Sequence, residues 1–312
     1  MQLAAGTNEV KIYDPVKELD TGALTEFIRL NWSDMVGALD VAKSTKRIYR
    51  SHIRQFIEWL QLVDINTVRN YKAALMERTN ITARTKAYKI AAVKVLFTEL
   101  HTRYRVLPLD IGKGVKLPKY GKGHVKTGVS HSEVKRVNEY ISKQPAAKRY
   151  RLNAMFHLLA LQALRQNEVA TLEAEKIDFA SSIARVQGKT GGDQIIHLLP
   201  DTIAAIRAYM KYENIKSGYL FRNKSNSHTG ENKHLAPRSI RRIFTSIFTA
   251  LDIDKSVHGF RHYCVTRLLQ LGFSLDEVMS FARITDVNTI KAYNDRIHDL
   301  ETVKKIGSKF KI

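Results

Sequence analysis

The sequence predicts a mainly α-helical protein with a small β-sheet, divided into two domains. Apolar residues recur at helical spacing along most of the chain, and two short β-type stretches flank a glycine-rich turn near residue 190. A length of 312 residues allows two domains that each bury a core. We expect an N-terminal tail at 1–20, a helical domain at 21–111, a basic linker at 112–128, and a second domain at 129–312 that ends in a C-terminal tail.

The charge of the chain indicates a polyanionic partner. The formal net charge is +21 and the pI is about 9.9. Residues 1–127 carry +10 and the remainder carries +11, so the charge is not confined to one tail. Such a balance is typical of proteins that bind nucleic acid, and it favours two domains that both contact one duplex.

Cysteine usage and hydropathy indicate a reducing compartment. Cys264 is the single cysteine, which excludes an internal disulfide, and its apolar helical setting favours a buried structural thiol over a nucleophile. No apolar run has the length of a transmembrane helix, and the N-terminus lacks the layout of a signal peptide. We expect a cytoplasmic, nucleoid-associated protein of a prokaryote, with no membrane partner.

The first domain is predicted to contain four helices. The first begins at Thr21, with Leu24, Phe27, Ile28, Leu30 and Trp32 forming its apolar face. Ser44–Thr45 cap a second helix at 46–62, and two more are expected at 68–78 and 82–100. Basic residues opposite the apolar faces are either solvated or phosphate-binding. The candidates for DNA contact in this domain are Arg47, Arg50, Arg54, Arg84, Lys86 and Lys89.

The second domain is predicted to begin with a capping box, because Ser130 is followed three residues later by Glu133. A nearly continuous apolar helix at 150–164 then ends at Arg165, and Glu168 follows one turn later. An arginine at the junction of two buried helices must be paired or must face an anion. A local salt bridge between Arg165 and Glu168 and an anion-binding site are both open.

A β-hairpin and two helices follow. Strands are predicted at 183–187 and 194–199, and the glycine-rich turn between them carries Lys189. This turn is not a nucleotide-binding loop, because the upstream glycine of that motif is missing and a strand follows. Helices are expected from Pro200 to Lys211 and from Pro237 to Ala250, and the segment between them is expected to be exposed. The candidates for DNA contact on the second of these helices are Arg238, Arg241 and Arg242, and Lys122 is the candidate in the linker.

The C-terminal stretch carries the strongest pattern. His258 and Arg261 stand at the front of a helix that runs through Cys264 to Leu271. Ser274 and Glu277 form a capping box for the next helix, which reaches about Arg283. Asp286 is the expected cap of a third helix that carries Tyr293. The basic tail at 300–312 contains apolar residues that either dock on a neighbouring protomer or fray.

These residues resemble the tyrosine site-specific recombinases, also called phage-integrase-type recombinases. The resemblance rests on the His-x-x-Arg pair at 258–261, the Leu-Leu-x-x-Gly helix end at 268–272, and Tyr293 on a short helix after the Thr-Asp-Val-Asn turn. The wording of 284–293 is closer to the Cre branch than to the Xer branch. Ser44 to Trp59 resembles the core-binding domain of the family. The resemblance implies a helical core-binding domain and a mixed α/β catalytic domain that form a clamp on double-stranded DNA.

The resemblance also implies a role for each candidate. Arg165 and Arg261 would bind the scissile phosphate, which suits the planar guanidinium. His258 would hydrogen-bond the phosphate or assist proton movement, and Lys189 would protonate the leaving 5′ oxygen. Tyr293 would attack to give a 3′-phosphotyrosyl link. Glu168 would orient its neighbours, and no metal or cofactor is expected.

One position departs from the family pattern. Ile284 stands where the family usually carries a His or Trp, and it cannot donate a hydrogen bond; the adjacent Arg283 is a possible substitute. A site-specific recombinase that acts as a tetramer in a synapse, and is a monomer when free, is the leading hypothesis. It includes possible accessory DNA-bending proteins. The alternatives are a type IB topoisomerase or telomere-resolvase-like enzyme and a catalytically impaired DNA-binding protein, whereas no motif supports RNA binding.

Overall fold

The computed structural model describes residues 20–121, 128–188, 192–223, 234–287 and 290. The chain forms two compact units, residues 1–123 and 124–312.

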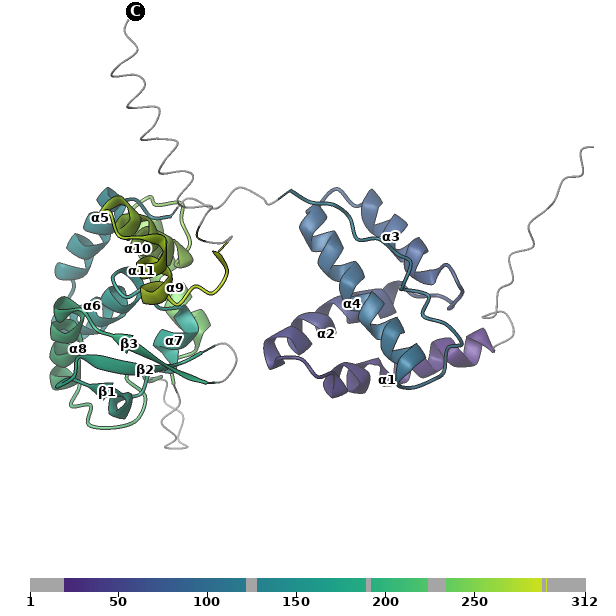
Figure 1. Ribbon diagram of the computed structural model, residues 1–312, viewed down its shortest axis with the longest axis horizontal. Helices are drawn as coiled ribbons and strands as arrows, with labels where there is room; N and C mark the ends of the chain where they lie inside the picture. Colours follow the sequence, from purple (N-terminus) through teal and green to yellow (C-terminus); the bar gives the residue numbers. More distant parts are fainter. Residues whose placement is uncertain (1–19, 122–127, 189–191, 224–233, 288–289, 291–312) are drawn as a thin grey trace, which may run out of the picture. The chain divides into compact units, whose positions relative to one another are not determined.

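The first unit packs four helices around one apolar core (Figure 1). Its helices are α1 (Thr21–Ala38), α2 (Lys43–Trp59), α3 (Thr67–Glu77) and α4 (Ala83–Thr102). Phe56 of α2 is fully buried, and its ring meets the edges of Tyr71 and Phe97 at centroid distances of 5.0 and 5.8 Å. These aromatic contacts join α2, α3 and α4, as expected from offset ring geometry.

Helix α2 differs from the prediction at both ends. It begins at Lys43 with Ala42 at the N-cap, so Ser44 and Thr45 lie inside the first turn and cap nothing. The first-turn residues Lys43 and Ser44 are exposed, so water can satisfy their N–H groups. The helix ends at Trp59 because Leu60 turns to extended backbone and enters the core.

Two large apolar residues of the first two helices are exposed, and one of them, Leu30, was assigned to the apolar face. Leu30 of α1 is 73% exposed and Ile48 of α2 is 49% exposed. Helical spacing places both near the border of the buried stripe, where the side chain faces outward. Helix α1 also continues past Trp32 to Ala38, since Met35 and Val36 are buried further along it.

The segment predicted as the start of a flexible linker is packed on the first unit. Lys94 Nζ donates to the carbonyl oxygen of Val115 at 2.6 Å, and Val115 is 4% exposed. The Arg84 guanidinium lies over the Tyr120 ring, 5.3 Å from its centroid. Residues 112–121 therefore extend the first unit, and the linker predicted at 112–128 is too long at this end.

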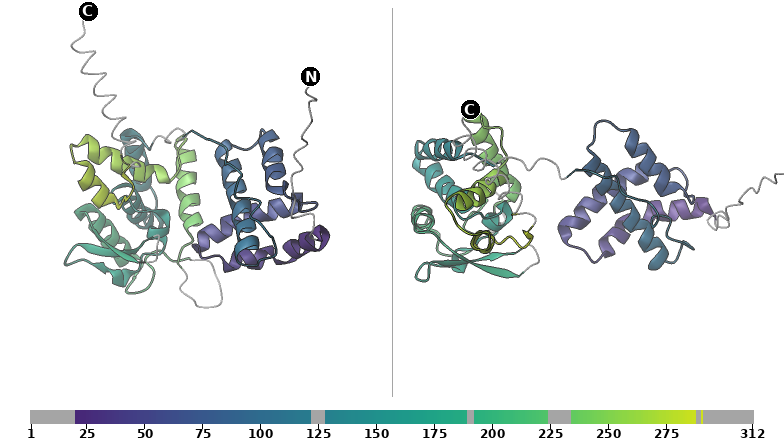
Figure 2. Two further views of the ribbon diagram at one scale, coloured as in Figure 1. Left: turned by 45° about the vertical axis from the view of Figure 1, so that its right-hand side comes forward. Right: turned by 45° about the horizontal axis from the view of Figure 1, so that its top comes forward.

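The second unit combines helices with one small antiparallel sheet, which lies along one edge of the helical part in both views of Figure 2. The strand order is β1-β2-β3, with Ala184 paired to Ile177 on one side and to Ile196 on the other. Strands β2 and β3 match the predicted hairpin, whereas β1 is too short to show alternation in the sequence. The strands are β1 (Ile177–Asp178), β2 (Ile183–Gln187) and β3 (Asp193–His197). The helices are α5 (His131–Ser142), α6 (Ala146–Ala160), α7 (Gln166–Ala170), α8 (Pro200–Tyr212), α9 (Pro237–Ala250), α10 (His258–Gln270) and α11 (Leu275–Ala282), with a single 3-10 turn, η1 (Ala174–Lys176).

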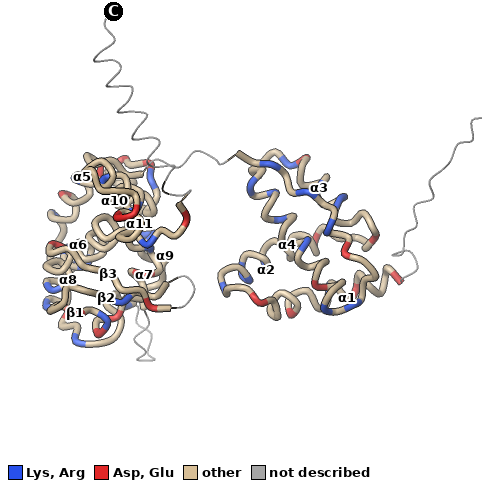
Figure 3. Tube along the Cα trace, in the orientation of Figure 1, with Lys and Arg blue, Asp and Glu red and all other residues tan. Residues whose placement is uncertain are grey.

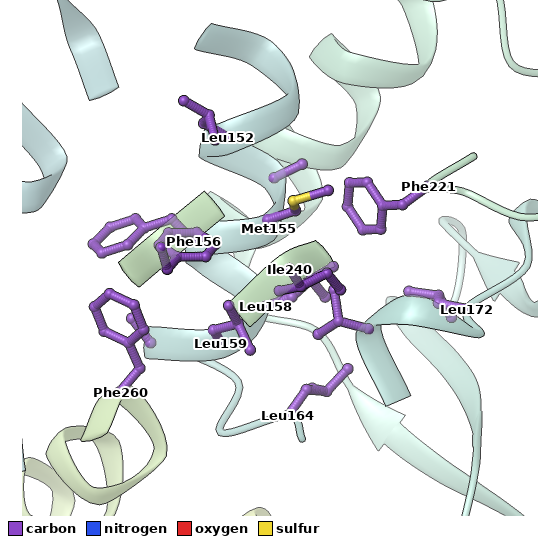
Figure 4. Close-up of a cluster of buried hydrophobic side chains, with 14 of the residues drawn as sticks. Leu152, Met155, Phe156, Leu158, Leu159, Leu164, Leu172, Phe221, Ile240 and Phe260 are labelled. Carbon is purple, nitrogen blue, oxygen red and sulfur yellow. The ribbon is translucent and has the colours of Figure 1, made fainter. Parts of the chain in front are cut away.

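Phe260 anchors α10 in the core of this unit. Its side chain is fully buried, and its ring stands edge-on to Phe156 of α6 at 5.6 Å and to Phe244 of α9 at 5.4 Å. Figure 4 shows Phe156 and Phe260 among the other buried side chains of this cluster. Burying a phenylalanine contributes roughly 1.5–3 kcal/mol. Because His258 and Arg261 flank Phe260 in the sequence, this packing fixes the front of α10.

In the part of the chain that the structure describes, no helix is both long and apolar enough to cross a membrane. The third predicted C-terminal helix, the tail at 300–312 and the N-terminal tail fall outside the described residues, apart from Asp20, Asp286, Val287 and Ile290.

Candidate active site

The candidate site lies where the C-terminal ends of α6 and α11 meet the front of α10. Glycine allows this front to approach its neighbour: a Cβ on Gly259 would lie 2.9 Å from a methyl carbon of Val129. Val129 donates its backbone N–H to the carbonyl oxygen of Gly259 at 3.2 Å. The segment that leads into α5 is thus bonded to the turn of α10 that holds His258 and Arg261.

Arg261 bridges two helix ends. The residue is 6% exposed, and its Nη1 and Nη2 atoms donate to the carbonyl oxygens of Ala163 and Ala282, each at 2.5 Å. These carbonyls follow α6 and end α11, where the helix dipole favours a positive charge. Arg261 therefore connects the chain after α6 to the end of α11.

Glu168 is the centre of the second group of contacts. This carboxylate is 3% exposed and accepts from Arg165 Nη1 at 2.8 Å, from the Arg165 backbone N–H at 2.8 Å, and from Arg283 Nη2 at 2.7 Å. The Arg165 side chain remains 42% exposed, whereas that of Arg283 is 8% exposed. The predicted pairing of Arg165 with Glu168 is confirmed, and the anion-binding role of Arg165 stays a prediction.

Two residues of the site adopt left-handed backbone. Ala163 has φ +51° and Arg283 has φ +53°, and both follow a helix end. This conformation costs a non-glycine residue about 1–2 kcal/mol. At Arg283 the turn is closed by its own N–H to the Ser280 oxygen at 3.2 Å and by the Ile284 N–H to the Met279 oxygen at 2.9 Å. Ala163 supplies one of the carbonyl oxygens that Arg261 binds, and Arg283 follows Ala282, which supplies the other.

His258 is kept neutral at physiological pH. Desolvation of the ring is the largest cause, although the residue as a whole is exposed, and the positive charges of Arg261 and Arg165 add to it; together they lower the pKa of His258 below 6.5. A neutral imidazole can either donate one hydrogen bond or accept a proton. Arg261 lies one turn after His258 on α10 and bonds the carbonyl oxygen of Ala163, two residues before Arg165. The ring of His262 lies edge-on to that of His258, with the centroids 4.8 Å apart.

Some of the predicted site residues lie outside the described part of the chain, and Ile284 lies within it. Lys189, Tyr293 and Lys122 lie outside the described residues, so their placement stays a prediction. Ile284 is partly buried and packs against the small apolar cluster that includes Cys264. Cys264 is 5% exposed, and burial raises the pKa of its thiol to about 12, which agrees with a structural role.

Most of the predicted DNA-contact residues are exposed, but two are not. Lys86 and Lys89 are 8% and 6% exposed; Lys86 Nζ donates to the Met76 carbonyl oxygen at 2.8 Å, and Lys89 Nζ donates to Gln55 Oε1. Their assignment as phosphate contacts is corrected, because both ammonium groups are engaged inside the first unit. Figure 3 shows the basic positions along the trace of each unit. The exposed candidates are Arg47, Arg50, Arg54, Arg84, Arg238, Arg241 and Arg242.

Sequence reasoning missed the backbone acceptors of the site. Ala163 and Ala282 contribute carbonyl oxygens, and no residue type signals such a role. An indirect signal was present, because Arg261 sits on a helix between apolar neighbours and had to find acceptors on other elements.

Known protein families and individual proteins are similar to this chain over most of its length. The model of the phage integrase family matches residues 128–298, more than half of the chain. Tyrosine recombinase XerD of Vibrio cholerae serotype O1 is 23% identical over 288 residues, which cover 88% of this chain and 91% of that protein. Tyrosine recombinase XerA of Pyrococcus furiosus is 24% identical over 254 residues, which cover 81% of this chain and 83% of that protein.

Solved structures share the fold. XerH recombinase bound to a palindromic difH substrate, in a post-cleavage complex, gives a TM-score of 0.66 at 14% identity and covers 93% of this chain and 86% of that one. The Tn1549 transposon integrase with transposon right end DNA gives 0.67 at 13% identity, covering 88% and 98%.

The fold and the site thus define an enzyme of the tyrosine recombinase type. The chain belongs to the phage integrase family. The named relatives favour the Xer-like branch over the Cre-like wording noted for 284–293.

Proposed function

We propose that this recombinase binds a specific double-stranded DNA site and cuts and rejoins it through a 3′-phosphotyrosyl intermediate at Tyr293. The single observation that carries the proposal is the hydrogen bond from Arg261, on the same turn of α10 as His258, to the carbonyl oxygen of Ala163, two residues before the exposed Arg165. Related proteins support the choice of ligand, since XerH, the Tn1549 integrase and lambda integrase have been solved with DNA.

The arginines would bind the phosphate. Two guanidinium groups directed at one phosphodiester stabilise the charge that accumulates on its nonbridging oxygens in the transition state. Arg165 is 42% exposed and offers nitrogens that Glu168 does not use, and the two carbonyl bonds of Arg261 hold its guanidinium in place. Because both terminal nitrogens of Arg261 are hydrogen-bonded to backbone carbonyls, its side chain would lose little conformational freedom when it binds the phosphate.

Tyr293, His258 and Lys189 would carry out the bond exchange and the proton transfers of strand cleavage. The Tyr293 oxygen attacks phosphorus, its proton leaves to a neighbouring base or to water, and the bond to the 5′ oxygen breaks. His258, whose pKa is lowered by partial burial and by the two arginines, is neutral near pH 7 and suits the role of hydrogen-bond donor or proton acceptor. Lys189 would supply the proton to the departing 5′ oxygen. The phosphotyrosyl bond conserves the energy of the cleaved linkage, so resealing needs no ATP.

The wider cycle follows from this step. A second attack by the free 5′ hydroxyl of another duplex exchanges strands through a Holliday junction. Such an exchange uses four active sites, so we propose a monomer when free and a tetramer in the synapse, with accessory DNA-bending proteins as possible partners. The choice among integration, excision and resolution depends on the sites and on those partners.

A nicked suicide substrate tests the chemistry. A duplex with the cognate site, or a pool of sites from DNA flanking the gene, is incubated with wild type and with Tyr293→Phe and separated on a denaturing gel. Wild type should give a protein-linked band, and Tyr293→Phe should give none while its DNA affinity stays within about threefold, because only one hydroxyl is removed. Site-specific binding without a band in wild type would refute the proposed chemistry and leave a DNA-binding protein.

A further inference from the structure

Arg283 occupies a position at which local stability favours a different residue. Its backbone has φ +53° at the end of α11, where glycine is the usual residue. Its side chain is 8% exposed, and its Nε is buried with no hydrogen-bond partner among the described residues. Burial also lowers the pKa of this guanidinium, although Glu168 opposes that effect. The left-handed backbone, the unpaired buried Nε and the burial of a charged group are each unfavourable. A glycine at this position would remove all three.

Arg283 also takes part in one of two sets of hydrogen bonds that join the same two segments of the chain. One link runs from Ala163 through Arg261 to Ala282, and the other runs from Arg165 through Glu168 to Arg283. Both links join the stretch 163–168 to the stretch 282–283. A shift of the α11 end would therefore disturb the contacts of both arginines that face the phosphate.

Charge gives Arg283 a specific effect on Arg165. With Arg165 alone, the buried Glu168 carboxylate would form a closed neutral pair, which binds phosphate poorly. A second guanidinium at 2.7 Å shares the carboxylate, so the cluster keeps a net positive charge on the exposed side of Arg165. The neighbouring Ile284, by contrast, has no group that could contribute to the site.

We propose that Arg283 is a positioning residue for DNA cleavage, which acts through Glu168 to hold Arg165 oriented and positively charged toward the scissile phosphate. This inference rests on the proposed function, because it assigns Arg165 to the phosphate. In this proposal Arg283 acts on the phosphate only through Glu168 and Arg165. It contributes to the rate of cleavage and little to DNA affinity, which many other basic residues supply.

The variants are chosen to separate charge from backbone. Arg283→Gly removes the charge and suits the left-handed backbone, and Arg283→Lys keeps the charge in the same backbone. The matched control is Asn214→Gly, because exposed Asn214 has φ +50° and lies at the end of α8. The measurements are the rate of covalent adduct formation on the nicked substrate at saturating protein, the Kd for the duplex, and the Tm.

Arg283→Gly is expected to lower the adduct rate by about 10–100-fold, because small misplacements of a catalytic group have effects of that size. Its Kd should change by less than about threefold, and its Tm should stay close to that of wild type, because glycine relieves the left-handed backbone and this gain offsets the lost bond to Glu168. Arg283→Lys should recover about tenfold of the loss, and Asn214→Gly should match wild type. A Tm that falls with the rate would make Arg283 a structural residue and overturn the proposal.

A double-mutant cycle tests the route through Glu168. Glu168→Gln should lower the adduct rate by itself, and adding Arg283→Gly should cost less than about threefold more, since coupled residues are non-additive. Two full and independent losses would overturn the route. If wild type forms an adduct and Arg283→Gly equals it, the Arg283 inference alone fails. If wild type forms none, the proposed function fails and this inference falls with it.

Discussion

Replacing Arg261 should destabilise the second unit strongly, whereas replacing Arg165 should have a small effect. Arg261→Gln removes two charge-assisted hydrogen bonds to the carbonyls of Ala163 and Ala282. Hydrogen bonds to a charged group contribute about 1.5–3 kcal/mol each, so the two together account for about 3–6 kcal/mol. The new amide restores part of one bond, and we expect a loss of about 3 kcal/mol. The Arg165 side chain is 42% exposed, and Arg165→Ala should cost about 1 kcal/mol or less.

These free energies convert to measurable shifts in Tm. For a unit of this size 1 kcal/mol corresponds to about 2–4 °C, so Arg261→Gln should lower the Tm by about 6–12 °C. Far-UV circular dichroism of the full chain follows the helices of both units. The chain offers an internal control, because its two tryptophans, Trp32 and Trp59, both pack against the core of the first unit.

The expected result is therefore a lowered circular dichroism transition with an unchanged tryptophan fluorescence transition. A shift below about 2 °C for Arg261→Gln would refute the reasoning that this guanidinium joins the two helix ends. An equal shift for Arg165→Ala would refute the contrast between the two arginines.

Two further predictions concern pH and salt. Burial lowers the pKa of His157 below 6.5, so the unfolded chain binds a proton more readily than the folded one. The free energy of unfolding should therefore fall as the pH drops below about 6.5. Unfolding midpoints measured over a series of pH values should show a smaller fall for His157→Gln. A stability that rises on acidification would contradict the sign. Arg50→Ala should lower the slope of log affinity against log salt by about one, because Arg50 is exposed, whereas Lys89→Met should leave the slope unchanged, because Lys89 is bound to Gln55. Equal changes in slope would show that Lys89 reaches phosphate after all.

Local signals predicted the fold well where a side chain bonds its own neighbourhood. The capping boxes at Ser130 and Ser274 are present as predicted, since each needs only a partner three residues away. The cap at Ser44–Thr45 is absent, because a serine or threonine before an apolar pattern also fits inside a first turn. Lys86 and Lys89 show a further limit: a periodic basic stripe does not reveal that its members bend inward to a carbonyl or an amide.

The candidate site was predictable in its residue types but not in its connections. The pairing of Arg165 with Glu168 follows from their spacing of one helical turn. The pairing of Glu168 with Arg283 spans 115 residues and depends on the tertiary fold. The sequence nevertheless pointed to Arg283 as a neighbour of interest, through the loss of a hydrogen-bonding residue at Ile284.

The position of Arg261 between two helix ends affects how related sequences should be compared. A side chain that the fold needs would persist in a descendant that no longer cut DNA, because its loss would also lower the yield of folded protein. Arg165 carries a much smaller folding constraint, being exposed and tied to one carboxylate. If Arg165 binds the scissile phosphate as proposed, its retention in a survey of relatives is the better marker of activity, whereas Arg261 alone indicates only that the unit still folds.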